Sequence, residues 1–113
     1  MRECHRTSEQ FASKAEQMIR SGNNFKAARL YAKAAELEEQ AFVAIDATKL
    51  RTRAIIGMSA AALWYKAGVY SSAERLANSL LDDPITPEFA KIELRILLAA
   101  VIGRKTLTWK DRK

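Results

Sequence analysis

Apolar side chains recur every three to four positions along most of this chain, a spacing that gathers them on one side of an α-helix. Five segments follow this pattern, and helix-stopping residues such as Gly22, Gly68 and Pro84 separate them. No segment alternates apolar and polar residues as a half-buried strand does. The sequence therefore predicts an all-α protein, with helices at residues 7–20, 25–45, 49–66, 71–82 and 87–102.

Two of the predicted helices are apolar on more than one side. Residues 54–65 are apolar or small in every direction, which predicts a buried central helix. Residues 96–102 carry no polar side chain, although the last helix of a stack should keep one face in water. Either the tail Leu107–Trp109 folds back over this helix, or a second copy of the chain packs on it. We favour a homodimer through Ile92, Ile96, Leu98, Val101 and Ile102.

Two stretches of the chain repeat one pattern of small residues 46 positions apart, from Gly22 to Gly68. Gly22 is followed by Ala27, and Gly68 is followed by Ala73, so that each Gly ends one helix and each Ala lies in the next. Two antiparallel helices cross closely where a small side chain such as Ala lies between them. The chain is therefore predicted to contain two helix–turn–helix units.

These two units resemble the tetratricopeptide repeat, a helical hairpin that stacks into a right-handed superhelix and binds other proteins. The resemblance covers about residues 11–81 and implies a non-catalytic scaffold or adaptor with about five helices in antiparallel hairpins. The interval of 46 residues departs from the 34 of that family. The second unit also looks like small bacterial tetratricopeptide-like proteins of unknown role. The residues that match the family's pattern are Ala15, Gly22, Ala27, Tyr31, Ala34 and Leu37 in the first unit and Ala61, Trp64, Gly68, Tyr70, Ala73 and Leu80 in the second.

The resemblance also implies where a partner binds. In such a stack the first helix of each hairpin lines a concave face, and we expect a peptide or helix of a protein partner to lie there. The expected lining residues are Glu9, Ser13, Glu16, Ile55 and Ser59.

A basic cluster lies near the start of the third predicted helix, where the helix dipole disfavours cations. It consists of Lys49, Arg51 and Arg53. One explanation is an acidic neighbour among residues 36–39 of the preceding helix, which otherwise reads as a solvated acidic face. The other is contact with an anionic partner. Nineteen Lys and Arg against thirteen Asp and Glu give a net charge of +6, which favours anionic partners in general.

The composition excludes several classes of function. One His and one Cys leave too few side chains for a zinc site or a Cys–His nucleophile, and no Gly-rich phosphate loop occurs. We therefore expect no enzyme activity, no catalytic residue, no cofactor and no metal. A single Cys excludes an intramolecular disulfide, and no apolar stretch is as long as a membrane span. No secretory signal is evident, so the expected location is the cytoplasm.

The length suits one domain. We expect a single helical domain at residues 7–103, a flexible segment at residues 1–6 and a basic tail at residues 104–113.

Two other functions are compatible with the sequence. The basic clusters favour a nucleic-acid-binding helical protein, which would gather Lys and Arg on one face beside an exposed aromatic side chain. The segment from Gly22 to Tyr31 also resembles the microtubule-interacting-and-transport module, a three-helix unit that binds an amphipathic helix in a groove. That second resemblance ends near Leu63 and leaves the last two helices unexplained. The protein-interaction module is the preferred function.

Overall fold

Residues 2–111 are described by the computed structural model of the chain, with side chains for residues 2–105. They form five helices: α1 (Arg2–Arg20), α2 (Asn24–Ala44), α3 (Leu50–Lys66), α4 (Tyr70–Asp82) and α5 (Glu88–Asp111). No strand occurs within this range. The prediction of an all-α fold is confirmed.

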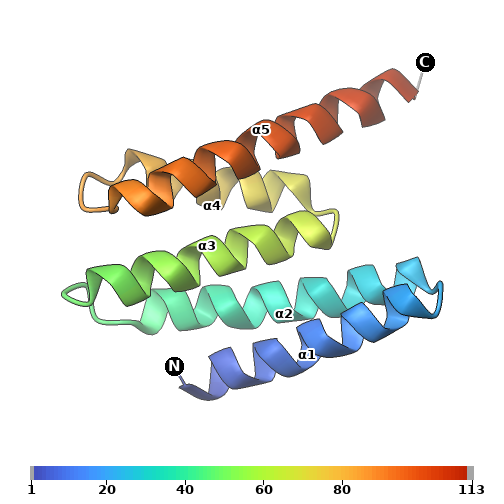
Figure 1. Ribbon diagram of the computed structural model, residues 1–113, viewed down its shortest axis with the longest axis horizontal. Coiled ribbons are helices and arrows are strands. Elements are labelled where there is room, and N and C mark those ends of the chain that lie inside the picture. The colour runs from blue at the N-terminus through green and yellow to red at the C-terminus, as the bar shows by residue number, and fades with distance from the viewer. Residues whose placement is uncertain (1, 112–113) are drawn as a thin grey trace.

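The helices form two layers (Figure 1). We call α1, α3 and α5 the front layer, and α2 and α4, which lie behind them, the rear layer. Each helix packs antiparallel against the one before it, and α5 also packs directly on α3. The Cα atoms span 44 × 31 × 17 Å, which is a slab about two helices thick. Grooves lie between neighbouring helices of the same layer, at α1 and α3, at α3 and α5, and at α2 and α4.

The two turns that lead from a front helix to a rear helix have the same backbone geometry. Gly22 (φ 83°) and Gly68 (φ 78°) both adopt a left-handed conformation that residues with a Cβ rarely take. In each turn the residue after the Gly donates its backbone N–H to the carbonyl five residues earlier, which ends the helix. These bonds are Asn23 to Met18 (2.8 Å) and Val69 to Trp64 (3.0 Å). The repeat in the sequence is therefore also a repeat in the structure.

Alanines at equivalent positions of the two units lie where the helices pack. Each unit buries one Ala from its front helix and one from its rear helix, with at most 1% of each residue exposed. A larger side chain at any of these positions would push the two helices apart. The four residues are Ala15 and Ala27 in the first unit and Ala61 and Ala73 in the second.

Two apolar cores stabilise the two units. The first core joins α1 and α2 and includes Tyr31, together with Leu63 from α3. The second core joins α3, α4 and α5 and includes Leu80 and Leu94. The half-buried Trp64 packs against both cores, so it connects the first unit to the second.

The first helix begins earlier than the sequence predicts, at Arg2 instead of residue 7. Residues 2–6 therefore belong to α1 and do not form a separate segment before it. The reason is a pair of polar contacts between α1 and α2, made by His5 and Ser8. Their partners lie 33 and 26 residues away, so no local pattern marks them.

The last helix also extends beyond its predicted end at residue 102. It runs through Gly103 to Asp111, so residues 104–111 continue α5 instead of beginning a separate tail. Gly103 is helical and makes no turn, and a Cβ at this position would meet no neighbouring atom of the described side chains within 4 Å. The backbone of residues 107–109 continues along the helix, and their side chains lie outside the described residues.

The residues predicted to form a dimer interface divide into two groups. Ile92, Ile96 and Ile102 are 50%, 62% and 51% exposed. Leu98 is half-buried against the second core, and Val101 is fully buried. The predicted set is therefore corrected, because Leu98 and Val101 point into the chain.

Candidate functional site

A groove of about 370 Å³ lies between α1 and α3 in the front layer, and we call it the front groove. Ile55 projects from α3 with 45% of its surface exposed, so α3 is not buried on all sides as its sequence predicts. Ile56, beside it, is buried. The groove thus has an apolar α3 side and a polar α1 side. Its lining residues are Arg2, His5, Arg6, Glu9, Thr52, Ile55 and Ile56.

The front groove is electropositive at one end. Both α1 and α3 begin at this end of the slab (Figure 1), so the positive poles of two helix dipoles meet there. Arg2 and Arg6 are exposed, and neither has an ion pair with any described residue. Lys49 and Arg51 lie at the start of α3 and are also exposed. Of these cations, Arg2 and Arg6 line the groove itself, so an anionic group bound there would meet their two guanidinium groups.

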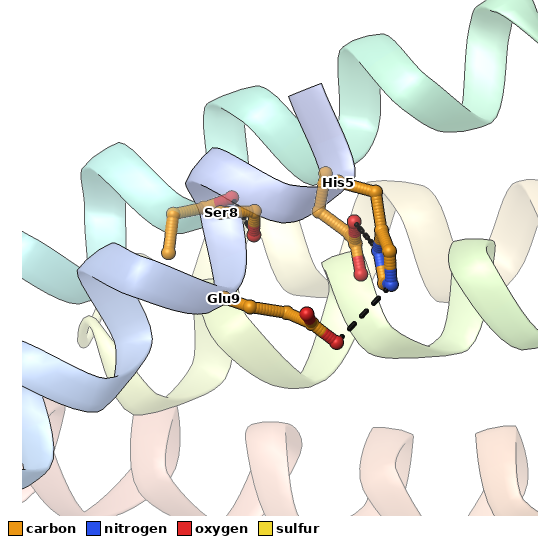
Figure 2. A network of polar contacts seen from close by, with 5 residues as sticks. His5, Ser8 and Glu9 are labelled. Atoms are coloured by element: carbon orange, nitrogen blue, oxygen red, sulfur yellow. Dashed lines mark hydrogen bonds and ion pairs between the residues drawn. The ribbon is translucent and has the colours of Figure 1, made fainter. Parts of the chain in front are cut away.

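A polar network holds the α1 wall of the groove to α2 (Figure 2). The imidazole of His5 lies between two carboxylates: Nδ1 is 2.7 Å from Oε1 of Glu38, and Nε2 is 3.2 Å from Oε1 of Glu9. Glu38 is buried, with 2% of its side chain exposed, whereas Glu9 faces water. One turn along α1, the buried hydroxyl of Ser8 donates to the backbone carbonyl of Ala34 at 2.8 Å. These contacts fix the position of His5 in the groove wall.

The environment of His5 favours its charged form. The hydrogen bond to Glu38 raises the pKa of the imidazole, partial burial lowers it, and the negative charges of Glu38 and Glu9 raise it further. The net effect is a pKa above the ordinary value of 6.5. No titratable side chain of α3 lines this part of the groove, because α3 contributes only Thr52, Ile55 and Ile56. An imidazolium also satisfies both carboxylates at once, since each of its nitrogens donates.

We expect the His5–Glu38 contact to stabilise the fold at acidic pH and to weaken as pH rises. Because the pKa of His5 is higher in the folded chain, the stabilisation is complete below about pH 6.5 and disappears as pH rises through the folded value. His5 is the only histidine, so its imidazole NMR signals titrate without overlap from other residues. Glu38→Gln should lower the titration midpoint of His5 clearly, and Glu9→Gln should lower it less. Equal shifts in the two variants would contradict the assignment of Glu38 as the main partner.

The predicted concave-face residues are only partly brought together. Glu9 and Ile55 line the front groove. Ser13 and Glu16 are exposed one and two turns further along α1, and Ser59 is half-buried on α3. The groove instead uses Arg2, Arg6 and His5, which the sequence analysis assigned to a flexible segment.

The basic cluster of residues 49–53 is also divided. Arg53 is only partly exposed: its Nη1 lies 3.5 Å from Oδ2 of Asp83, and its guanidinium lies 4.5 Å from the centre of the Phe42 ring. An acidic neighbour therefore exists, but it comes from the segment after α4 and not from residues 36–39. Arg51 lies over the ring of Phe89 at 5.1 Å. Arg53 is therefore half-buried, whereas Lys49 and Arg51 are exposed on the surface of the protein.

The acidic residues of α2 are not one solvated face. Glu36 is exposed, as expected, and Glu38 is buried beside His5. Glu39 accepts a hydrogen bond from the indole N–H of Trp64 at 2.8 Å and pairs with Arg75 at 3.0 Å. This second network lies in a groove of about 490 Å³ between α2 and α4, whose lining includes the exposed Val43.

A third groove, of about 390 Å³, lies on the outer side of α1 and α2, and we call it the basic groove. The cations that line this groove come from α2. On α1, Nζ of Lys14 lies over the ring of Phe11, 5.9 Å from the ring centre. Aromatic and cationic side chains therefore gather on one face here, which the sequence did not indicate. The lining residues are Phe11, Lys26, Arg29, Leu30 and Lys33.

Other kinds of site are not found among the described residues. No three His, Cys, Asp or Glu side chains in this range come together as metal ligands. None of the helices searched in the described part of the chain has the length and apolar character to cross a membrane.

Comparisons with known proteins assign the chain to no group. No family model matches it, and searches of curated proteins and of solved structures find no similar protein. The function has to be argued from the geometry of the grooves.

Proposed function

We propose that this chain is a non-catalytic protein-interaction module whose front groove binds an acidic amphipathic segment of a partner protein. The observation that carries the proposal is the exposed Ile55 in the same groove as Arg2 and Arg6, neither of which has an ion pair with a described residue. An apolar anchor with a charged rim is the usual composition of a peptide-binding groove. The proposed role is that of a scaffold or adaptor.

The arrangement of the helices supports this function. Two hairpins with equivalent turns and equivalent buried alanines follow each other, and their first helices, α1 and α3, lie side by side in the front layer. Within this proposal the chain is a tetratricopeptide-like stack, and the front groove is its partner-binding face. The extra length between the two units lies in the long α2 and in the segment before α3.

The charges of the groove specify the partner. Glu9 is the one carboxylate in the lining, and it is paired with His5, so it presents little free negative charge. Arg2, Arg6 and the two helix N-termini attract carboxylates, with a favourable contribution of about 0.3–1 kcal/mol from each helix dipole. A partner helix with Asp or Glu beside a Leu or Ile would match both the rim and the apolar side.

A designed peptide tests the proposal. The probe is a fluorescent amphipathic peptide with Leu on one face and Glu elsewhere, and its control carries Lys in place of Glu. We expect the acidic peptide to bind and the basic peptide not to bind. Ile55→Glu removes the anchor and adds a negative charge, so it should weaken binding by about tenfold or more, a loss of at least ~1.4 kcal/mol. The equally exposed Ile19 lies at the other end of α1, and Ile19→Glu should leave the affinity unchanged.

A second candidate function, nucleic-acid binding, is favoured by the basic groove. Lys26, Arg29 and Lys33 lie there beside Phe11, which is the combination that single strands use for backbone and base contacts. A labelled oligothymidylate distinguishes the two functions. If it binds with steep salt dependence and loses affinity in Arg29→Glu but not in Ile55→Glu, nucleic-acid binding replaces our proposal.

A further inference from the structure

The last helix has no hairpin partner. α1 pairs with α2 and α3 pairs with α4, whereas α5 packs on α4 and α3 and leaves its opposite side open. Large apolar side chains remain exposed on α5, with Ile92 50% and Ile96 62% exposed, and Ile96 also borders a groove between α3 and α5. We call Phe89, Ile92, Ile96, Ala99 and Gly103 the α5 stripe.

The α5 stripe has the spacing of a coiled coil. Its members follow one another at intervals of three and four residues, which is the a and d pattern of a heptad repeat. The buried side of the same helix, which includes Ala90, Leu94 and Val101, lies on the opposite face and packs within the chain. The α5 stripe is therefore a second apolar face, which meets α3 at Phe89 and Ile96 and still leaves half or more of Ile92 and Ile96 exposed.

The sizes of the side chains along the α5 stripe indicate what packs against it. The first half carries Phe89, Ile92 and Ile96, and the second half carries Ala99 and Gly103. If a second copy of α5 lies antiparallel, each isoleucine meets a small residue: Ile96 faces Ala99 of the second copy, and Ile92 faces Gly103 of the second copy. In this register Phe89 faces position 106, whose side chain lies outside the described residues. Gly103 has room for this contact among the described residues, because none of their atoms counted outside its own turn lies within 4 Å of the position of its missing Cβ.

The charges beside the stripe also favour this orientation. In a parallel pair, Glu88 of one helix would lie against Glu93 of the other, at the flanking g and e positions where charged side chains meet. In the antiparallel pair, Glu93 lies near Ala100 of the second copy and Arg95 lies near Ile102 of the second copy. The parallel pair would therefore contain two repulsive Glu88–Glu93 contacts, one on each side, and the antiparallel pair avoids both.

We propose that two copies of this chain associate through antiparallel packing of their α5 stripes, large residues against small. The paired segment, residues 89–103, is about 22 Å long, which makes a small interface. An interface of this size is at the lower limit for a specific complex, so the dissociation constant is expected on the order of 10 µM. The association is independent of the front groove.

Sedimentation velocity over a concentration series tests the association. Between about 2 and 200 µM, the wild-type mass should rise from 12.7 kDa toward twice that value. Gly103→Leu places a large side chain against Ile92 of the second copy, and it should remain monomeric throughout. Because the substitution meets open space and replaces a helical Gly, its melting temperature should not fall. Loss of the dimer therefore cannot be ascribed to unfolding.

Two results would overturn the proposal: a wild-type chain that stays monomeric at the highest concentration, or a Gly103→Leu variant that dimerises like the wild type. Ile55→Glu is the matched control, since it alters an exposed Ile of the front groove and should leave the dimer intact. A chain that dimerises but does not bind the acidic peptide would contradict the proposed function alone. A chain that binds the peptide but stays monomeric would contradict this inference alone.

Disulfide cross-linking tests the orientation, in a Cys4→Ser background that removes the single native thiol. A mixture of Ile92→Cys and Gly103→Cys chains should form a mixed disulfide, because these positions face each other only in the antiparallel pair. Either variant alone should cross-link at least about tenfold less. Efficient self-linking of Ile92→Cys would show a parallel pair and contradict the proposed packing.

Discussion

Replacement of Leu80 by Ala should lower the free energy of unfolding by about 3–4 kcal/mol. Leu80 is 2% exposed and lies in the second core, where α3, α4 and α5 meet. Removal of the isopropyl group beyond its Cβ loses apolar burial and leaves a cavity that three packed helices cannot close. Urea unfolding followed by far-UV circular dichroism measures the change, with the midpoint shifted and the slope unchanged.

Leu50 provides the control for this substitution. It is the first residue of α3 and is 42% exposed, so Leu50→Ala should cost less than about 1 kcal/mol. Equal losses in the two variants would mean that Leu80 is not part of a close-packed core, and the assignment of α5 to that core would fail with it.

Replacement of Gly57 by Leu should destabilise the chain by about 3 kcal/mol, in spite of the higher helix propensity of Leu. A Cβ at this position would already lie 3.0 Å from both Leu80 Cδ1 and Phe42 Cε1. Gly57 therefore lies where side chains of α2 and α4 pack directly against α3, and the additional atoms of Leu have no space. Urea unfolding gives the magnitude.

Two further variants separate this steric effect from a general effect of the substitution. Gly103→Leu makes the same change at an open position of α5 and should not lower the stability. Combination of Gly57→Leu with Leu80→Ala makes room for the new side chain, so the double variant should lose clearly less than the sum of the two single losses. Additive losses would contradict direct contact between these positions.

The elements and the repeat were predictable from the sequence, because local features determine them. Gly22 and Gly68 end their helices in the conformation that Gly alone takes readily, and both turns close with the same hydrogen bond. Ala27 and Ala73 are buried as the repeat pattern indicates. Local spacing was sufficient in these cases, because each element is set by residues within one or two turns of each other.

The front groove was predicted only in part, since its polar residues depend on contacts between distant positions. His5 helps to hold residues 2–6 in α1 through Glu38, 33 residues away. Arg53 is paired with Asp83, 30 residues away. No local pattern marks either pair.

Gly103 shows a different limit of the sequence pattern. A Gly after an apolar run usually marks the end of a helix, and the helix was predicted to stop there. Gly103 is helical instead, and it lies on the open side of α5. In the dimer that we propose, Gly103 belongs to the α5 stripe, and its lack of a side chain leaves space for Ile92 of the second copy.

The central claim is that the front groove binds an acidic amphipathic segment, and amide chemical-shift mapping tests it most directly. The measurement uses ¹⁵N-labelled Gly103→Leu chain, which is expected to be monomeric, titrated with the acidic Leu/Glu peptide. Our account predicts the largest shifts at Arg6, Thr52 and Ile55, with little change along α4. An absence of shifts, or shifts confined to the basic groove or to α5, would contradict it.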